Sequence, residues 1–351
     1  ARPSGRHLLL GVLEDGSVAA TDAALEALTP VEDIGWEFGE WAKNEAQRAS
    51  FLGSAAGALE GEIGSTTGQF LIRVLQRRSD TLVRWVLRAM TTPATTDVMS
   101  IVERGVRSPD PETKDQAIEA LETIGARTVL SVLLPLLEPD TDRRRPGARE
   151  TLRRLSEDFD PWLRALAIRC LATEIRDDLA HLASISAADQ SDLVRQALPS
   201  FGPMPIEHLD TLNRMDRVLV LQRVPMFSGL DPEDLDLVAA TMAEVQFEPR
   251  ERIYSDGEPG DEMLVIVEGE AVVSKARNGS RDVIETYGPG DHVGELSLLR
   301  GGQRIADVDS GDPGLHGLVL SKADLLSILD ERPSVAMGML ATLATRLAEQ
   351  T

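Results

Sequence analysis

The clearest chemistry in this chain is carried by a carboxylate and a guanidinium placed around a short turn at residues 294–308, GELSLLRGGQRIADV. Gly294 lets a backbone approach a ligand closely, and the turn after it exposes amide N–H groups. Arg304 can clamp a phosphate with two parallel charge-assisted hydrogen bonds. Glu295 would repel that phosphate, so it needs a hydrogen bond from another part of the ligand, such as a ribose hydroxyl. These residue types indicate a site for a sugar phosphate.

The stretch resembles the phosphate-binding cassette of cyclic nucleotide-binding domains, whose pattern is F-G-E-x-A-L, a short loop, and then R-x-A-x-V. Upstream, residues 224–235 (VPMFSGLDPEDL) resemble the first helices of that family, and 256–261 (DGEPGD) with 267–271 (VEGEA) resemble its strand and turn signature. The resemblance spans about residues 217–351. The alternative is an antiparallel β-barrel in which the Gly-Glu pair and the arginine occur by chance. The cassette positions that fall in register without a gap are Gly294, Glu295, Leu298, Arg304, Ala306 and Val308.

The resemblance implies that a ligand sits inside a β-roll against the cassette. Glu295 would then accept the ribose 2′-hydroxyl, and Arg304 would pair with the cyclic phosphate. Backbone amides at Leu296, Ser297 and Ile305 would complete the cradle. Two alternatives stay open: Arg304 can form an internal salt bridge with Glu295 or Asp307, and Glu295 can cap the short helix that is expected to open at Leu296. The predicted ligand-binding residues are Gly294, Glu295, Leu296, Ser297, Arg304 and Ile305.

Three residues depart from the pattern of the family. Ile305 follows the arginine where the family usually has Ala, Ser or Thr, so a bulky side chain can narrow the pocket or tilt the base. It also removes the hydroxyl that guanine-preferring members use, which favours cAMP over cGMP as the ligand. Val293 replaces the frequent Phe, and Arg250 stands at the start of a strand where Gly is usual; both are interpreted as packing changes.

The final helix resembles the hinged lid that covers the base in this family. Its apolar face includes Val335 and Leu347 as well as the three lid candidates. Core packing or a dimer seam would produce the same pattern. The lid candidates are Met339, Leu340 and Leu343.

Composition restricts the class of protein. The 351 residues carry 36 Lys and Arg against 58 Asp and Glu, a formal charge of −22, which should repel nucleic acid and anionic membranes. The length favours two or three domains. Cys170 is the single cysteine, and its apolar neighbours predict a buried thiol in a reducing compartment. The run 143–145, three arginines, is interpreted as a solvated loop tip, with a contact to an acidic partner as the alternative.

No segment approaches the roughly 20 apolar residues that cross a bilayer, and no signal-peptide pattern opens the chain. We therefore expect a soluble, cytoplasmic protein with no nucleic-acid partner and no membrane insertion of its own. The chain begins at Ala1, so it can be a processed chain or a fragment, including the cytoplasmic portion of a membrane protein.

From about residue 8 to 212 the apolar spacing is helical. The phrase at 110–121, DPETKDQAIEAL, recurs at 160–171, DPWLRALAIRCL, and weaker copies begin at Asp80 and Asp192. In both strong copies Asp is suited to the N-cap and Pro to the first helical position. With second helices such as 126–137, the copies resemble HEAT-type repeats; a generic helical bundle is the alternative.

The pattern breaks at 202–205, GPMP, which is the predicted boundary. Short β-rich runs follow from Val245 to about Leu320, at 262–267, 270–275, 282–286 and 315–320, with helices at 321–329 and 333–349. The predicted fold class is multidomain: an all-α HEAT-like solenoid followed by an α+β cyclic nucleotide-binding domain, an antiparallel β-roll flanked by helices. The predicted domains are 1–205, helical repeats; 206–222, a connecting helix; and 223–351, the nucleotide-binding domain.

The leading functional hypothesis is a regulatory, non-catalytic module that senses cAMP and acts through the helical scaffold on a partner protein or a covalently linked membrane domain. No Cys/His cluster has metal-ligand spacing, and no nucleophile elbow or phosphate loop is present. A roll that has lost its ligand and serves as an interaction scaffold is the alternative. The architecture also resembles the soluble part of bacterial carriers of the nucleotide-transporter type. A transcription factor is disfavoured, because no helix-turn-helix follows the last helix and the charge is unsuitable.

Overall fold

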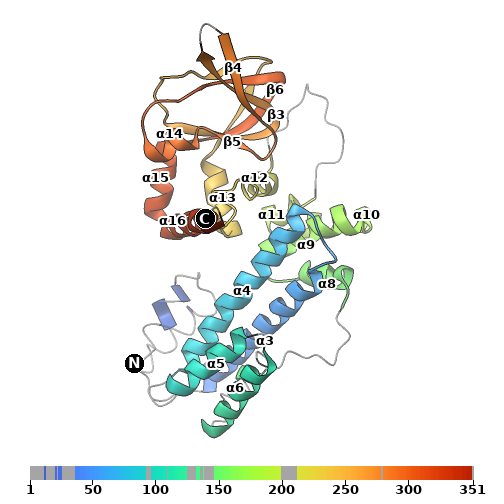
Figure 1. Cartoon of the computed structure of the whole chain (residues 1–351). Helices are drawn as coiled ribbons and strands as arrows, with labels where there is room; N and C mark the ends of the chain where they lie inside the picture. The colour runs from blue at the N-terminus through green and yellow to red at the C-terminus, as the bar shows by residue number, and fades with distance from the viewer. Residues whose placement is uncertain are drawn as a thin grey trace. The chain divides into compact units, whose positions relative to one another are not determined.

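The computed structural model describes residues 36–91, 96–108, 110–124, 146–198, 212–277 and 280–349, with short pieces of 12–25 and 132–137. By packing, the chain divides into two compact units, Ala1–Leu155 and Ser156–Thr351. Figure 1 shows helices in the first unit, and helices followed by a β-sheet in the second. The predicted helical region before an antiparallel β-domain is confirmed at this level, and a HEAT solenoid stays a prediction.

Two long helices, α3 (Trp36–Leu59) and α4 (Thr66–Met90), lie side by side in the first unit (Figure 1). The α4 helix begins after Ser65, whose hydroxyl accepts a 3.0 Å hydrogen bond from the Gly68 N–H. Helices α5 (Thr96–Arg107) and α6 (Pro111–Ile124) form a second pair, and α8 (Ala148–Leu155) packs on α3. The weaker sequence copy at Asp80 starts no helix, because this residue lies inside α4.

The two strong copies of the Asp-Pro phrase both begin helices, as predicted. The Asp110 carboxylate accepts the Thr113 N–H at 3.1 Å at the start of α6. The Asp160 carboxylate accepts the Trp162 N–H at 2.9 Å at the start of α9 (Pro161–Cys170). Each cap satisfies a backbone donor that the first helical turn leaves unpaired. Cys170 at the end of α9 is buried, as predicted, and burial raises the pKa of its thiol.

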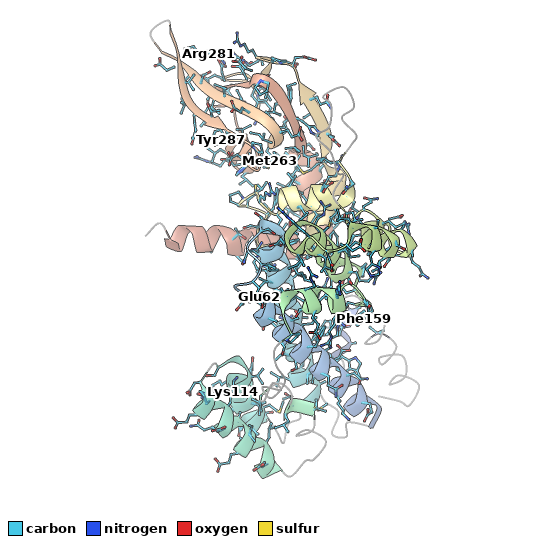
Figure 2. The ribbon with its side chains drawn as sticks, turned by 90° about the vertical axis from the view of Figure 1, so that its right-hand side faces the viewer. Glu62, Lys114, Phe159, Met263, Arg281 and Tyr287 are labelled. Atoms are coloured by element: carbon cyan, nitrogen blue, oxygen red, sulfur yellow. The ribbon has the colours of Figure 1, made fainter. Side chains whose placement is uncertain are left out.

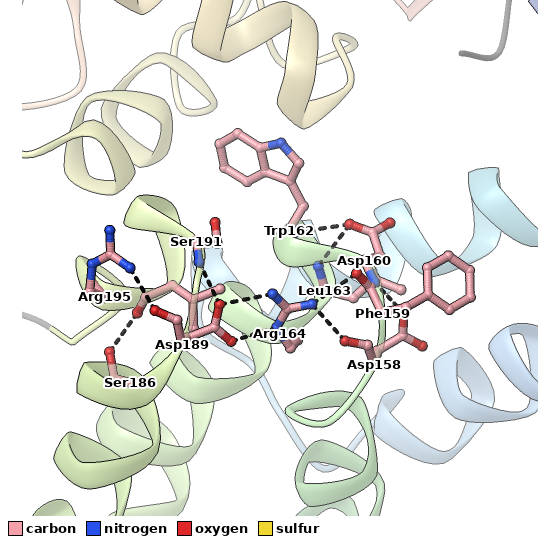
Figure 3. A network of polar contacts seen from close by, with 11 residues as sticks. Asp158, Phe159, Asp160, Trp162, Leu163, Arg164, Ser186, Asp189, Ser191 and Arg195 are labelled. Carbon is pink, nitrogen blue, oxygen red and sulfur yellow. Dashed lines mark hydrogen bonds and ion pairs between the residues drawn. The ribbon is translucent and has the colours of Figure 1, made fainter. Parts of the chain in front are cut away.

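Helix α9 continues into a π-helical turn, η1 (Leu171–Ile175). It packs on α11 (Asp192–Arg195), which in turn packs on α10 (Leu179–Ala188). Arg164 organises this group (Figure 3): its Nε and Nη2 donate to both carboxylate oxygens of Asp189, at 2.8 and 2.9 Å. Its Nη1 donates to the carbonyls of Asp158 and Phe159, each at 2.8 Å. One guanidinium thus joins the start of α9 to the end of α10.

Helix α12 (Arg214–Leu221) lies within the predicted connecting helix, whose first part falls outside the described residues, as do the GPMP break and the 143–145 arginine run. Arg169 of α9, which is 6% exposed, donates to the Asp216 carboxylate at 2.7 Å. Arg217 donates to the Glu244 carboxylate at 2.7 Å. Side chains on α12 therefore bind both the preceding helices and the first strand of the sheet.

The β-domain opens with α13 (Pro232–Thr241), which has Pro in its first turn after the N-cap residue Asp231. Its six-stranded antiparallel sheet has the central order β1-β6-β3-β4, with β2 paired to β6 and β5 paired to β3. The strands are β1 (Ala243–Phe247), β2 (Arg252–Tyr254), β3 (Glu262–Arg277), β4 (Ser280–Tyr287), β5 (His292–Val293) and β6 (Asp307–Ser321). Figure 2 shows Met263, Arg281 and Tyr287 on this part of the chain.

The predicted runs at 262–267 and 270–275 are one strand, β3, rather than two. Gly269, at φ 83°, resembles a turn in the sequence but lies at a bulge where the register on β6 shifts. A Cβ at Gly269 would lie 2.2 Å from the Gly314 carbonyl oxygen, so the bulge requires glycine. Arg250 has φ 61°, which explains why glycine is usual at that position.

A buried apolar cluster forms the core of the β-domain. Val293 belongs to this cluster, which agrees with its interpretation as a packing residue. Helices α15 (Lys322–Glu331) and α16 (Pro333–Glu349) follow β6 at the predicted positions. Among the described residues, no helix has both the length and the apolar character needed to cross a bilayer. The cluster consists of Tyr254, Leu264, Ile266, Ala271, Val293, Val308 and Leu315.

Candidate functional site

The short helix of the cassette, α14 (Glu295–Arg300), begins one residue earlier than predicted, directly after Gly294. Gly294 has φ 91°, in the region that favours glycine. A Cβ there would lie 2.5 Å from Arg304 Nη1 and 3.0 Å from the Glu262 carbonyl oxygen. Glycine is therefore required both by its backbone conformation and by the guanidinium that packs against it.

Arg304 is 5% exposed, and its Nη1 makes every hydrogen bond recorded for its side chain. The acceptors are the carbonyl oxygens of Glu262 at 2.8 Å and Gly294 at 3.3 Å, and the Ser297 hydroxyl at 3.1 Å. Arg304 Nε is buried without a partner. In the described part of the chain, no carboxylate forms an ion pair with Arg304, so the alternative of an internal salt bridge is not observed; Asp307 pairs with Arg252 at 2.6 Å instead.

An aromatic ring that sequence reasoning missed lies against this guanidinium. The guanidinium carbon of Arg304 is 3.6 Å from the ring centroid of Tyr254, which ends β2 and is 3% exposed. Burial, and next the Glu262 carboxylate, raise the pKa of Tyr254 well above its ordinary value, against the opposing charge of Arg304. The only sequence signal was an aromatic residue two positions before the DGEPGD run.

The DGEPGD run forms the frame that holds the arginine. The Arg304 N–H donates to the Glu258 carbonyl at 2.7 Å, and the Gly257 N–H donates to the Arg304 carbonyl at 2.9 Å. The Gly260 N–H donates to the Gly302 carbonyl at 3.0 Å. A Cβ at Gly260 would lie 2.3 Å from the Ser297 Cβ. Two segments that the sequence treated as separate family signatures thus bind each other along their backbones.

The structure brings three predicted site residues into contact: Gly294, Ser297 and Arg304. Ser297 is 9% exposed, and its hydroxyl donates to the Gly294 carbonyl at 3.3 Å. The Leu298 N–H makes the first hydrogen bond of α14, to the Gly294 carbonyl at 3.2 Å. The backbone N–H groups before Leu298 therefore have no acceptor within the helix. The predicted cradle amides of Leu296 and Ser297 are among them.

The other predicted residues surround this centre. Leu296 is 48% exposed and Ile305 is 65% exposed, so the Ile305 side chain is not packed into the protein. The N-cap of α14 is Gly294, which has no side chain, and the Glu295 side chain is partly exposed. It lies near Tyr287, whose pKa is raised to about 12 by its hydrogen bond to Glu285, by burial and by nearby carboxylates that include Glu295.

The lid candidates have different environments. Met339 is 5% exposed, Leu340 is 59% exposed, and the Leu343 side chain lies outside the described residues. Helix α16 packs closely on the turn before α13, since a Cβ at Gly338 would lie 2.5 Å from Leu230 Cδ2. Part of the apolar face is thus core packing, which was the alternative, and a lid function stays a prediction. Within the described chain, no group of three or more His, Cys, Asp and Glu could hold a metal ion.

Comparison with known families decides what this arrangement is. Residues 244–332, which contain the cassette, Tyr254 and the DGEPGD run, match the family model of the cyclic nucleotide-binding domain. These residues form a cyclic nucleotide-binding domain. The model covers the β-domain from β1 to the end of α15.

The CRP-like cAMP-activated global transcriptional regulator of Mycobacterium tuberculosis is 26% identical over 129 residues, which are 36% of this chain and 57% of the relative. The chain thus spans little more than half the length of the curated relatives it matches.

Two solved structures are also similar. The N-terminal domain of a transcriptional regulator from Streptomyces coelicolor A3(2) is 32% identical, with coverage of 37% of this chain and 92% of that one and a TM-score of 0.36. The regulatory domain of Toxoplasma gondii PKA, solved with cAMP, is 28% identical, with coverage of 34% and 46% and a TM-score of 0.32.

Proposed function

We propose that this domain binds a cyclic nucleotide, with cAMP preferred over cGMP, and that the chain is a regulatory module that senses it. The observation that carries the proposal is the buried guanidinium of Arg304, which has neutral acceptors and no carboxylate partner among the described residues. A buried charge is costly unless it is paired. An anion that reaches Arg304 would supply the missing partner.

The geometry favours a phosphate as this anion. Because Nη1 is occupied by protein acceptors, Nε and Nη2 are the guanidinium nitrogens without recorded hydrogen bonds. That edge can bind two oxygens of one phosphate in parallel. The unpaired amides at the start of α14 would add donors to the same group.

Glu295 is proposed to bind the ribose. It follows Gly294 directly, and no hydrogen bond or ion pair of its carboxylate is recorded in the described chain. A free carboxylate beside a phosphate site needs a hydroxyl donor, and the ribose 2′-hydroxyl of a cyclic nucleotide lies on the sugar that carries the phosphate. A 2′-deoxy nucleotide would lose this contact.

The preference for cAMP rests on Ile305. Its side chain supplies no hydroxyl for the guanine amino group, and it is exposed next to Arg304 in the chain. The wider proposal is a non-catalytic, cytoplasmic protein whose helices, as HEAT-like repeats, carry the signal to a partner protein or to a linked membrane carrier. The Mycobacterium tuberculosis regulator to which this chain is similar is cAMP-activated, which supports cAMP as the ligand class.

Calorimetry with cAMP and cGMP on the whole chain tests this proposal. We expect heat of binding for cAMP and weaker binding of cGMP. Arg304→Ala should weaken cAMP binding by about 2–5 kcal/mol, because the phosphate would lose its charged partner. Arg300→Ala is the matched control: it removes an exposed arginine from the end of α14 and should leave the affinity unchanged.

Circular dichroism must show that Arg304→Ala remains folded, since the side chain also bonds to the cassette backbone. Retained affinity in folded Arg304→Ala would show that the phosphate binds elsewhere. If the unmodified chain gives neither heat nor a thermal shift with cAMP or cGMP, the sensor proposal fails. The alternative, an interaction scaffold built on a roll without a ligand, would then be favoured.

A further inference from the structure

The environment of Arg304 contains one group that the proposed binding chemistry does not use, the ring of Tyr254. The ring centroid and the guanidinium carbon are 3.6 Å apart, well inside the distance of about 6 Å at which an aromatic face attracts a cation. Tyr254 ends β2 opposite Val308 of β6, inside the apolar cluster of the sheet. The ring is thus held by the buried apolar residues of this cluster.

We infer that Tyr254 is a positioning residue for Arg304, whose ring holds the guanidinium plane in the orientation that a ligand phosphate requires. This inference rests on the proposed function for its effect on affinity. Guanidinium groups stack on aromatic faces, and a stacked group keeps its N–H edge free for a planar pair of hydrogen bonds. Here Nη1 is held by Glu262, Gly294 and Ser297, and the ring fixes the remaining rotation.

The packing around the pair leaves it one arrangement. A Cβ at Gly294 would lie 2.5 Å from Arg304 Nη1 and 3.4 Å from Tyr254 Cε2. The guanidinium and the ring therefore both pack against this glycine. Arg304 Cδ lies 3.2 Å from the position of a Cβ at Gly260. Preorganisation of this kind raises affinity, because the side chain does not lose rotational freedom when the ligand arrives.

The ring, rather than the hydroxyl, is the active part of Tyr254. Its buried hydroxyl makes no hydrogen bond of standard geometry among the described residues, although it lies close enough to the Glu262 carboxylate and to Arg304 for both to act on its pKa. Burial and the Glu262 carboxylate also keep the phenol protonated, because they raise its pKa. A neutral ring acts on the guanidinium through its face, and phenylalanine has the same face.

Three variants of the whole chain separate this role from general core packing. Tyr254→Phe keeps the ring, Tyr254→Leu removes it, and Leu315→Ala opens the same apolar cluster at a residue of similar burial. We expect cAMP affinity to fall about 5- to 30-fold in Tyr254→Leu and to change less than about twofold in Tyr254→Phe. Leu315→Ala should lower the melting temperature without a comparable loss of affinity.

A spectroscopic measurement tests the geometry without a ligand. The ¹H–¹⁵N signal of Arg304 Nε can be assigned by its loss in Arg304→Lys. Its chemical shift should change in Tyr254→Leu, because the ring current disappears. The shift should stay the same in Tyr254→Phe and Leu315→Ala. An unmoved resonance in Tyr254→Leu would overturn the inference even if the chain binds no cyclic nucleotide. If cAMP binds, equal affinity losses in the Phe and Leu variants, or in Leu315→Ala and Tyr254→Leu, would also overturn it.

Discussion

Gly294 illustrates, at the scale of single residues, how a backbone position can set the geometry of a site. Its φ of 91° turns the chain into α14 and brings its carbonyl to Arg304 Nη1. The absence of a Cβ leaves the space that the guanidinium occupies. The same residue thus provides both the turn and the room, and a side chain at this position would act on the arginine directly.

We therefore expect Gly294→Ala to lower the free energy of unfolding by more than the backbone strain of an alanine at positive φ would. The matched control is Gly61→Ala, outside the cassette, at φ 82° with open space around a Cβ. Backbone strain should cost each variant about 1–2 kcal/mol. Only Gly294→Ala should also displace Arg304 and weaken cAMP binding. Urea unfolding and calorimetry measure both effects, and equal behaviour of the two variants would contradict this account.

The residues of the site could be predicted from the sequence to different extents. Gly294, Glu295 and Arg304 lie in one short segment, so their spacing identified them together. Tyr254 is fifty positions before Arg304, and its contact exists because β2 pairs with β6 across the roll. Single-sequence patterns carry no information on which strand faces which, and for that reason the ring was missed.

At the scale of elements, polar contacts join α12 to the helices before it and to the helix and strand after it. Arg169 reaches it from α9, and Arg214 on α12 pairs with Asp236 of α13. Glu244 of β1 accepts the Leu212 N–H at 3.1 Å, Arg217 at 2.7 Å and His316 Nε2 of β6 at 2.7 Å. A single carboxylate thus links the start of α12, its body and two strands.

Glu244 should make the stability of the second unit depend on pH. Burial opposes its ionisation, but hydrogen bonds from Leu212 and His316 and the charges of His316 and Arg217 keep its pKa below the ordinary value of 4.5. Between the two pKa values the unfolded chain binds more protons than the folded one, so stability falls as the pH falls. The contribution of Glu244 is complete above about pH 5 and disappears as the pH drops through the lower, folded-state value.

Glu244→Gln keeps the shape and one acceptor but removes the charge. We expect it to lower the free energy of unfolding by about 1–3 kcal/mol at pH 7 and by progressively less toward pH 3. Exposed Glu251→Gln is the comparison, and chemical unfolding at a series of pH values is the measurement. A loss for Glu244→Gln that stays the same from pH 7 to pH 3 would mean that the carboxylate acts through shape alone.

Helices and strands could be predicted where residues close together in the sequence determine where they begin. Asp110 and Asp160 begin helices because Asp caps and Pro follows, and both rules act within four residues. The length of β3 could not be predicted, since Gly269 has the appearance of a turn residue. Its tolerance inside a strand depends on the close approach of Gly314 from β6, a residue far away in sequence.

At the scale of the whole molecule, the packing division at Leu155 and Ser156 differs from the change in sequence texture near residue 205, which lies outside the described residues. The sequence pattern reports the local spacing of apolar residues, whereas the division into compact units depends on contacts between elements. Helices α9 to α11 have helical texture but share a unit with the sheet, because Arg169 binds Asp216 and the Arg214 N–H donates to Gln196 at 3.0 Å.

Each of the two units has buried apolar residues of its own, so we expect two thermal transitions by scanning calorimetry of the whole chain. A ligand that binds only the folded state stabilises the unit that holds its site, by about 2.7 kcal/mol at a free concentration of 100 Kd. For a unit of this size that corresponds to a rise of roughly 5–10 °C.

Saturating cAMP should therefore shift one transition and leave the other in place, and Arg304→Ala should abolish the shift. The shifted transition should also be the one whose temperature falls in Glu244→Gln, because Glu244 and Arg304 belong to the same unit. If both transitions move together with cAMP, the two units unfold as one, and ligand binding is coupled to the helical region. That outcome would contradict independent unfolding and would assign the first unit a direct part in the response to the nucleotide.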